Sequence, residues 1–560
     1  MRKQWLAGML GTGLLLTFGA TAGAALTGEQ TEAVQEQMSA EQVSAEQVSA
    51  EQEQISAELE QEISRGGDAW YEIFVRSFCD SDEDGIGDLD GVTGKLDYVK
   101  ELGFDGIWLM PVMPSQTYHK YDVTDYYSID PEYGNLDDMK ELLAAAKEKE
   151  IRVIIDLVFN HTSSGHPWFV EACDYLETIG DEEPDLTKCP YVDYYHFAKE
   201  PGVGNWYPVG ETGWYYEGQF WSEMPDLNLD SEAVRGEIEA VTDFWLELGV
   251  DGFRLDAAKE YFTGNKTKNI EVLEWYTGYV KEQNQDAYLV AEVWDSVETI
   301  ASYYKSGIDS IFDYTFGNSS GQIIQKINQA DNGKAGGAFG RNLQKVTALY
   351  QENNPGMINA PFLSNHDTGR VSGFVSYDPA RVKFAGAMNL FMSGNVFVYY
   401  GEELGMTGSG IDENKRASMY WSAKEGAEGM VTEAPPQMEQ QEHRFGSLEE
   451  QEEDSNSIYN YYKTAISLRN QYPALAMGET VSLSDTVADP DVCAIQKTCG
   501  DQTLYCIYNF SKEESEIPLE QLPSQADLAA GLCTDTQQEV VLTETSLVLP
   551  PYGIALLMPQ

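Results

Sequence analysis

The sequence predicts an α/β fold in which eight strands and the helices between them form a (β/α)8 TIM barrel, followed by a small antiparallel β domain. Eight apolar runs of strand length lie between residues 71 and 400, and amphipathic stretches such as 136–149 and 241–248 occur between them. After residue 480 the runs become short and alternate in polarity, which is typical of antiparallel strands. We therefore expect a barrel over residues 67–479 and a β domain over residues 480–560.

The expected barrel strands are residues 71–78, 106–111, 151–158, 252–255, 288–293, 310–314, 358–363 and 395–400. In such a barrel the C-terminal ends of the strands form the active face. The interval between the third and fourth strands is too long for one loop and one helix. Residues 162–226 are rich in Gly, Pro, Tyr and Trp and have weak periodicity, so we expect them to form an inserted subdomain on the active face. In the β domain the expected strands are residues 492–497, 503–508, 540–542, 546–549 and 554–558.

The N-terminal 66 residues are expected to lie outside the barrel. Residues 1–24 have the pattern of a secretory signal peptide, with Arg2 and Lys3 before an apolar stretch at 5–18 and small residues at 22–24. Residues 25–66 contain ten Glu and no aromatic residue, and such a segment cannot bury enough apolar surface to fold alone. We expect a secreted protein with an acidic spacer, a partner-binding stalk being the alternative. No second long apolar run occurs, so no transmembrane helix is predicted.

The charge of the chain excludes some partners. With 93 acidic and 35 basic residues the formal net charge is −58, and such a surface repels nucleic acid and anionic lipid. A neutral substrate is compatible with this charge, and we expect a monomer. Export permits disulfides, and Cys173 with Cys189 is one candidate pair, with another among the last four of the seven cysteines. The sequence has no Cys/His cluster that would indicate a transition-metal site.

Three acidic residues stand at the ends of predicted strands, namely Asp256, Glu292 and Asp367. Asp256 follows Arg254 by two residues, so both side chains point to the same face of a strand. A nearby guanidinium favours the ionised form of a carboxylate, as a nucleophile needs. Glu292 has two apolar neighbours in sequence and no cation beside it, and an apolar setting raises the pKa of a carboxyl, as a general acid needs. Such a pair is what a retaining glycosidase requires, with the two carboxyls roughly 5 Å apart.

Five short motifs occur in the order DLVFNH (156–161), MPDLN (224–228), GFRLDAAK (252–259), EVWD (292–295) and NHD (365–367). Together they resemble the α-amylase superfamily, glycoside hydrolase family thirteen, over roughly residues 69–560. The resemblance implies that Asp256 is the nucleophile, Glu292 the acid/base and Asp367 a stabiliser of the transition state. It also implies that further residues bind the substrate: His119, Tyr121, His161, Arg254, Lys259 and His366. Among these, Tyr121 matches the family tyrosine that stacks on the reacting sugar, and an aromatic ring suits the apolar face of a pyranose.

The acidic segment 80–88 follows the first predicted strand. Alternate carboxylates around a Gly turn are typical ligands of hard cations. The segment resembles the calcium loop of the oligosaccharide-acting branch of the family. The resemblance implies Ca²⁺ ligands from Asp80, Asp82, Asp84, the carbonyl of Ile86, and Asp88. An acidic surface turn without a metal is the alternative.

The motifs leave more than one specificity open. The segment 224–228 resembles the branch between oligo-1,6-glucosidases and neopullulanases, whereas Ala257 and Lys259 resemble amylases. Export favours a polymeric substrate, so we expect retaining endo-hydrolysis of α-1,4-glucosidic bonds in starch- or glycogen-type glucans and maltooligosaccharides. The alternatives are a neopullulanase- or α-glucosidase-like hydrolase with transfer activity and, from another class, a non-catalytic glucan-binding protein on the same barrel. The presence of all three carboxylates argues against the last.

Overall fold

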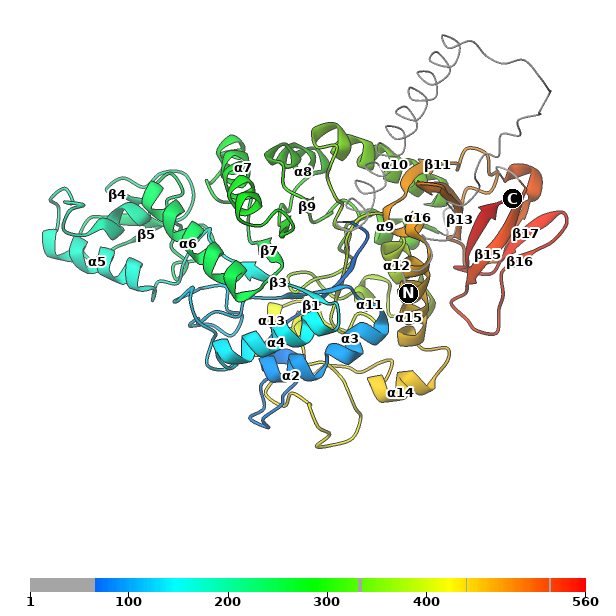
Figure 1. The fold of residues 1–560 in the computed structure, drawn as a ribbon, viewed down its shortest axis with the longest axis horizontal. Helices are drawn as coiled ribbons and strands as arrows, with labels where there is room; N and C mark the ends of the chain where they lie inside the picture. Colours follow the sequence, from blue (N-terminus) through cyan, green and yellow to red (C-terminus); the bar gives the residue numbers. More distant parts are fainter. Residues whose placement is uncertain (1–65, 331–334, 440, 523–524) are drawn as a thin grey trace, which may run out of the picture. The chain divides into compact units, whose positions relative to one another are not determined.

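A curled parallel sheet forms the centre of the computed structural model, which describes residues 66–330, 335–439, 441–522 and 525–560 (Figure 1). Within these ranges the sheet has seven strands in the order β10-β1-β2-β3-β7-β8-β9. The strands are β1 (Ala69–Ile73), β2 (Gly106–Leu109), β3 (Arg152–Leu157), β7 (Gly252–Leu255), β8 (Tyr288–Ala291), β9 (Ser310–Ile311) and β10 (Val396–Tyr399). Nearly all of their side chains are buried, which is why their sequences form continuous apolar runs.

The predicted strand 358–363 forms a single bridge instead of a ladder. Ala360 pairs in parallel with Phe312, next to β9, and on the other side the amide of Phe397 in β10 donates to the carbonyl of Pro361 at 2.8 Å. Pro361 has no amide hydrogen, so it cannot donate to a regular ladder. The segment nevertheless connects the two edge strands of the sheet. The predicted (β/α)8 fold is therefore confirmed, with one irregular strand.

Helices follow the strands along the chain, and the capping residues at their ends explain where they begin and end. They are α2 (Leu89–Gly94), α3 (Leu96–Leu102), α4 (Leu136–Glu148), α6 (Glu232–Leu248), α7 (Lys266–Gln283), α8 (Val297–Tyr303), α9 (Gln322–Gln329), α10 (Ala335–Asn353), α11 (Val371–Phe374), α12 (Pro379–Leu390), α13 (Asp412–Lys415), α14 (Leu448–Glu453), α15 (Ile458–Gln471) and α16 (Pro473–Met477). For example, α6 begins where the side chain of Ser231 accepts the amide of Val234, and it ends at Gly249 with a left-handed φ of 115°.

Between β3 and β7 the chain forms a separate group of elements, as predicted for the insertion. They are α5 (Pro167–Ile179), the short 3-10 helix η4 (Pro190–Tyr194), and an antiparallel sheet of β4 (Phe197–Ala198), β5 (Trp206–Pro208) and β6 (Tyr215–Glu217). Phe169 of α5 packs edge-on against Tyr216 of β6, with ring centroids 4.8 Å apart. An antiparallel bridge between His161 and Asp226 joins the two ends of the insertion, so both ends lie beside the barrel.

The candidate disulfide between Cys173 and Cys189 is absent. Both residues are free thiols, and the Sγ of Cys189 contacts the carbonyl of Glu171 at 3.6 Å. This part of the prediction is wrong, because spacing in sequence does not show which cysteines meet in the fold.

The C-terminal region is antiparallel, as predicted. One sheet has the order β11-β12-β13-β18-β15 and the other β14-β17-β16. The strands are β11 (Glu479–Ser482), β12 (Val492–Cys499), β13 (Gln502–Asn509), β14 (Ser515–Pro518), β15 (Ala526–Leu532), β16 (Val541–Leu542), β17 (Ser546–Leu549) and β18 (Ile554–Pro559). Sequence patterns missed β11, β14 and β15. Lys497 of β12 is buried and donates to the carbonyls of Phe391 and Leu475, which fixes this sheet to the end of α12 and to α16.

A buried carboxyl after β10 makes stability depend on pH. Glu402 accepts hydrogen bonds from Ser364 at 2.7 Å and Tyr462 at 3.2 Å, and burial raises the pKa of Glu402 from its ordinary 4.5 to about 8. The folded state therefore holds this proton more tightly than the unfolded state does. We expect the stabilising effect of the proton to be full below pH 4.5 and to fall by roughly 1.4 kcal/mol per pH unit as pH rises towards 8.

Denaturant unfolding between pH 5 and pH 9 measures this effect. Because other buried acids titrate in the same range, the informative quantity is the difference between the wild type and Glu402→Gln, since glutamine keeps the shape of the side chain but does not titrate. We expect the pH dependence to be shallower in the variant. Parallel curves for the two proteins would show that Glu402 does not titrate as described.

Candidate active site

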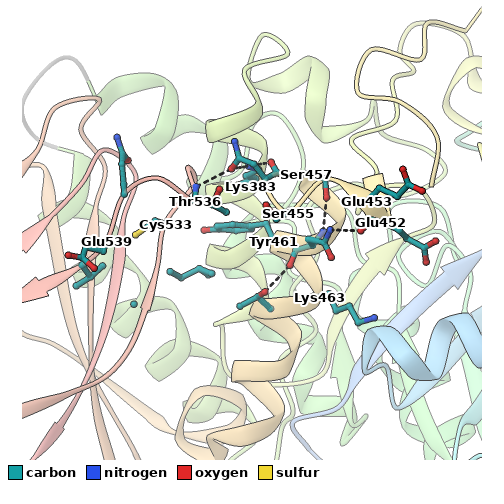
Figure 2. Close-up of a pocket in the computed structure, with 17 residues that line it drawn as sticks. Lys383, Glu452, Glu453, Ser455, Ser457, Tyr461, Lys463, Cys533, Thr536 and Glu539 are labelled. Carbon is teal, nitrogen blue, oxygen red and sulfur yellow. Dashed lines mark hydrogen bonds between the residues drawn. The ribbon is translucent and has the colours of Figure 1, made fainter. Parts of the chain in front are cut away.

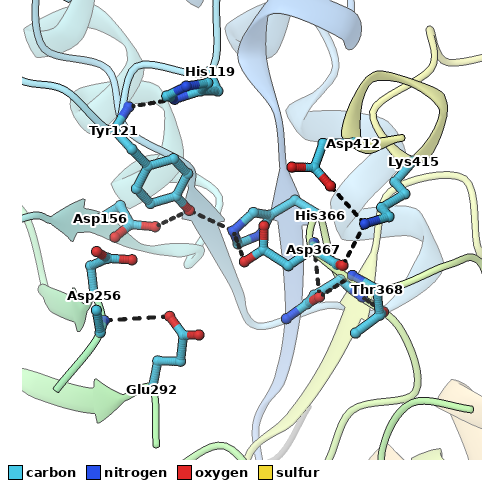
Figure 3. Close-up of polar contacts among 12 residues, drawn as sticks. His119, Tyr121, Asp156, Asp256, Glu292, His366, Asp367, Thr368, Asp412 and Lys415 are labelled. Carbon is cyan, nitrogen blue, oxygen red and sulfur yellow. Dashed lines mark hydrogen bonds and ion pairs between the residues drawn. The ribbon is translucent and has the colours of Figure 1, made fainter. Parts of the chain in front are cut away.

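One pocket at the C-terminal ends of the barrel strands contains all three predicted catalytic carboxylates (Figure 3). It has a volume of about 560 Å³ and is lined by His119, Tyr121, His161, Phe220, Trp221, Met224, Asp256, Ala257, Lys259, Glu260, Glu292, Trp294, Asp367, Asp412 and Arg416. Two other predicted substrate-binding residues, Arg254 and His366, are buried in direct contact with the carboxylates. The structure thus brings together the residues that the sequence places more than 240 positions apart.

Arg254 connects the carboxylates. Its Nη1 lies 2.9 Å from Asp156 Oδ1 and 2.6 Å from Asp256 Oδ1, and its Nη2 contacts Glu292 Oε2. The sequence predicted a cation beside Asp256 only. That prediction is wrong for Glu292. Strands β7 and β8 pair in parallel with Leu255 opposite Ala291. The next residue of each strand end, Asp256 and Glu292, therefore contacts the same guanidinium.

Burial gives Glu292 the property of a general acid. Burial raises the pKa of Glu292 to about 7. The charge of Asp256 also raises this pKa, whereas the charge of Arg254 lowers it. A carboxyl with such a pKa holds a proton near neutral pH and can donate it. Asp156 is also buried, which raises its pKa to about 7. Unlike Glu292 it does not line the pocket, so its contacts with Arg254 and Tyr121 position other groups.

Asp367 has the opposite electrostatic environment. Its Oδ2 lies 3.0 Å from His366 Nε2 and its Oδ1 lies 3.0 Å from Arg416 Nη2. Although burial raises the pKa of Asp367, these two cations hold it below its usual range. His366 is itself held by Glu72, whose Oε1 lies 2.6 Å from Nδ1. Burial lowers the pKa of His366, but Asp367 and Glu72 together raise it to about 9, so the ring is an imidazolium between two carboxylates.

The side chains expected to bind the reacting sugar are held by hydrogen bonds. Tyr121 Oη lies 3.0 Å from Asp156 Oδ2 and 2.6 Å from His366 Nε2. Dashed lines mark both contacts in Figure 3. His119 Nδ1 accepts the amide of Tyr121 at 3.1 Å. Burial, with the charge of Arg416, lowers the pKa of His119 to about 4, so the ring is neutral and its Nε2 is left as the donor. His161 Nε2 is buried with no hydrogen-bond partner within the described ranges.

The family is decided by comparison with known proteins. A model of the alpha amylase catalytic domain matches residues 72–478. The chain belongs to the alpha-amylase family. It is 40% identical over 450 residues to Alpha-amylase 3 of Dictyoglomus thermophilum, covering 80% of this chain and 85% of the relative. It is 30% identical over 536 residues to the Oligo-1,6-glucosidase of Parageobacillus thermoglucosidasius, covering 81% and 91%.

Solved structures agree with this assignment. Eubacterium rectale Amy13B superposes with a TM-score of 0.85 at 44% identity, covering 89% of this chain and 96% of that one. An alpha-amylase from H. orenii superposes with a TM-score of 0.77 at 34% identity, covering 89% and 100%. The protein is therefore a glycoside hydrolase of the alpha-amylase family, and its substrate is a carbohydrate.

Exposed aromatic rings form part of the pocket of this family member. Phe220 and Trp221 are each 48% exposed and Trp294 is 45% exposed, and all three line the pocket. The Trp294 ring is stacked on Tyr314, with ring centroids 4.9 Å apart. Large aromatic faces open to solvent inside a pocket are suited to the apolar faces of sugar rings. Sequence reasoning did not assign these three residues to the site, because exposure cannot be read from residue type.

Lys259, one of the predicted substrate-binding residues, lines the pocket beside Trp294. Its Nζ donates to the carbonyl of Trp294 at 3.1 Å and lies 3.4 Å from Asp295 Oδ2. Two other functional residues were missed in the sequence. Glu72 could have been found, because it is a charged residue inside the apolar strand β1. Arg416 gave no signal, since it follows the short helix α13 in an irregular segment.

The acidic loop after β1 lies apart from the pocket residues and brings three of its carboxylates together. Asp80, Asp82 and Asp88 each offer an oxygen within 4.8 Å of the others. Asp84 is not part of this group, and its Oδ1 accepts the amide of Ile86 at 2.8 Å. Three converging carboxylates are a donor set that fits a hard cation such as Ca²⁺.

Proposed function

We propose that this glycoside hydrolase is a secreted α-amylase that cleaves internal α-1,4-glucosidic bonds of starch- or glycogen-type glucans with retention of configuration. The observation that carries the proposal is the arrangement of Asp256 and Glu292 on neighbouring nitrogens of Arg254 in one pocket, with the pKa of Glu292 raised to about 7 by burial. This combination supplies an anionic carboxylate and a protonated carboxyl side by side.

The reaction follows from these roles. Asp256 attacks the anomeric carbon while Glu292 donates its proton to the glycosidic oxygen, which leaves as an alcohol. Glu292, now ionised, takes a proton from the water that hydrolyses the glycosyl-enzyme ester. Asp367 stays ionised because of His366 and Arg416, so it stabilises the positive charge that develops on the sugar ring. His119 and His161 offer ring nitrogens to sugar hydroxyls, and Tyr121 offers an aromatic face.

The linkage is supported by relatives and by two residues. Two relatives named alpha-amylase are 40% and 34% identical to this chain, and the amylase-like residues Ala257 and Lys259 both line the pocket. A second candidate, hydrolysis of α-1,6 bonds, is favoured by the 29% identity to a Glucan 1,6-alpha-glucosidase and the 30% identity to an Oligo-1,6-glucosidase. A non-catalytic role is disfavoured because all three carboxylates lie at one pocket.

Digestion of soluble starch, maltotriose, pullulan and isomaltose distinguishes these functions. An endo-acting α-amylase rapidly abolishes iodine staining of starch and releases a mixture of maltooligosaccharides. Dominant release of glucose from isomaltose would overturn the proposal in favour of α-1,6 specificity, and panose from pullulan would indicate a neopullulanase-like enzyme. Export is tested separately, since N-terminal sequencing of protein from the culture medium should begin near residue 25.

The proposal includes a structural Ca²⁺ ion at the acidic loop, held by Asp80, Asp82 and Asp88. A ligand that binds only the folded state stabilises it, by about 2.7 kcal/mol at a concentration one hundred times Kd. We therefore expect a chelator to lower Tm and added Ca²⁺ to restore it. The variant with all three residues changed to Asn should start from the lower Tm and not respond to chelator. An unchanged Tm of the wild type with chelator would remove calcium from the proposal.

A further inference from the structure

Lys120 is an unusual residue at an unusual position. It lies between two residues of the pocket, His119 and Tyr121, yet it is only 3% exposed and does not line the pocket itself. Its φ of 67° is left-handed, a conformation that residues with a side chain seldom adopt and glycine adopts freely. A buried lysine in a glycine-like backbone conformation indicates that its side chain stabilises this turn.

The ammonium group of Lys120 is held by two carboxylates, neither of which lines the pocket. Its Nζ lies 2.8 Å from Asp130 Oδ2 and 2.7 Å from Glu132 Oε2. These partners are themselves fixed. Asp130 is buried and accepts the amide of Ser115 at 3.2 Å, and Glu132 also pairs with Arg76 at 3.3 Å. The ion pairs therefore attach the turn to residues 130–132, farther along the same segment between β2 and α4.

The two neighbours of Lys120 depend on the conformation of this turn. His119 and Tyr121 line the pocket, whereas Lys120 does not line it and pairs with Asp130. The amide of Tyr121 donates to His119 Nδ1, which sets the tautomer of the imidazole, and Tyr121 Oη reaches Asp156 and His366. A rotation of the backbone at Lys120 would move both rings, and small displacements of groups that position a substrate have large effects on rate.

We propose that Lys120 is a positioning residue, whose ion pairs with Asp130 and Glu132 hold a left-handed turn and thereby place His119 and Tyr121 against the reacting sugar. This role rests on the proposed function, because it requires both rings to bind substrate.

Two substitutions separate the anchor from the backbone. Lys120→Met removes the charge and keeps a chain of similar length, and Lys120→Gly also relieves the left-handed strain. We expect both to lower kcat/KM on maltooligosaccharides by roughly 10- to 100-fold. Wild-type kcat/KM in Lys120→Gly would overturn the proposal, because it would show that the turn needs no anchor.

A matched control is Lys383→Met at another buried lysine. Lys383 is also 3% exposed, and its Nζ donates to the carbonyls of Asn456 and Thr534 at 2.5 and 2.8 Å. It lines a different pocket, of about 720 Å³, between α12, α14, α15 and the C-terminal strands (Figure 2). We expect Lys383→Met to lower Tm and leave kcat/KM of the folded protein unchanged. An equal loss of kcat/KM in both methionine variants would assign the effect to general destabilisation and overturn the proposal.

A double-mutant cycle with His119→Ala tests whether Lys120 acts through its neighbour. If it does, Lys120→Met should lower kcat/KM by a clearly smaller factor in the His119→Ala background than in the wild type, because only its effect through Tyr121 is left and residues that act together are not additive. Multiplicative effects would overturn the proposal. This outcome is distinct from failure of the proposed function, in which His119→Ala alone would leave kcat/KM unchanged.

Lys120→Met leaves Asp130 without this cation and Glu132 with Arg76 alone, so it could prevent folding. The variant Lys120→Met/Asp130→Asn/Glu132→Gln removes those charges as well. It should fold and still show the reduced kcat/KM, because the turn has lost its anchor. Full activity of this triple variant would overturn the proposal.

Discussion

Replacing Glu292 with glutamine should lower kcat on soluble starch by roughly 10²- to 10⁴-fold, the usual contribution of a positioned general acid. Glutamine keeps the shape of the side chain but has no proton to give to the leaving oxygen. The free energy of unfolding should change little, since Arg254 keeps its contacts with Asp156 and Asp256. Initial rates of reducing-end release measure the effect, and denaturant unfolding shows that the variant is folded.

The control for this variant is Glu298→Gln, which makes the same chemical change at an exposed position of α8 and should leave kcat unchanged. A second control is an aryl glycoside with a good leaving group. The leaving oxygen of this substrate needs no proton. The substitution should therefore slow the first chemical step much less with the aryl glycoside than with starch. Equal rates of starch hydrolysis in Glu292→Gln and the wild type would reject the acid/base role of Glu292.

The alkaline side of the pH profile gives an independent check. Because burial raises the pKa of Glu292 to about 7, the proton-bearing form disappears as pH rises through 7. We expect kcat/KM for maltooligosaccharides to fall above that pH, with a weaker fall for the aryl glycoside. If kcat/KM began to fall only several pH units higher, another group would have to supply the proton.

The positions of the barrel strands could be predicted because parallel strands are buried on both faces and are therefore apolar throughout. That Asp256, Glu292 and Asp367 lie at one pocket could be predicted for a related reason, since polar residues directly after such runs lie at the active face. Even the irregularity of the strand 358–363 could be explained from the sequence, because the strand contains Pro361. Local chemistry of this kind needs no knowledge of distant contacts.

Contacts between distant residues could not be predicted. Glu72 and His366 are 294 positions apart, and nothing local pairs them. The contact of Arg254 with Glu292 depends on the register between β7 and β8, which the two sequences do not specify. In the acidic loop, the sequence shows which residues are carboxylates but not that Asp80, Asp82 and Asp88 converge without Asp84. These details decide the electrostatics of the site, and they come from the fold as a whole.

Removal of the Arg254 cation should have the largest effect on stability. Its guanidinium contacts three carboxylates, and its own side chain is almost fully buried. Removing one partner of a buried ion pair leaves an uncompensated charge, and it typically costs about 3–5 kcal/mol. We expect Arg254→Met to lose at least that much free energy of unfolding and to have no measurable activity, because Asp256 and Glu292 lose the group that holds them together.

Arg341→Met is the matched control for Arg254→Met. Arg341 Nη1 lies 2.8 Å from Asp485 Oδ1, a distance similar to those at Arg254, but the two side chains are 51% and 84% exposed. Exposed pairs are worth about 0–1 kcal/mol, so this variant should unfold nearly as the wild type does. Equal losses in the two variants would show that burial is not what makes the Arg254 contacts important.

The pH dependence of Arg254→Met identifies the cause of its instability. Without the cation, the pKa values of Asp156 and Glu292, which burial already raises, rise further above their unfolded values, so the folded variant takes up protons that the wild type does not. Stability of the variant is then greatest at low pH and is lost as pH rises, because ionisation creates unpaired buried charge. The difference in free energy of unfolding between Arg254→Met and the wild type should therefore shrink between pH 8 and pH 5. A difference that does not vary with pH would mean that lost packing of the arginine chain, rather than its charge, explains the effect.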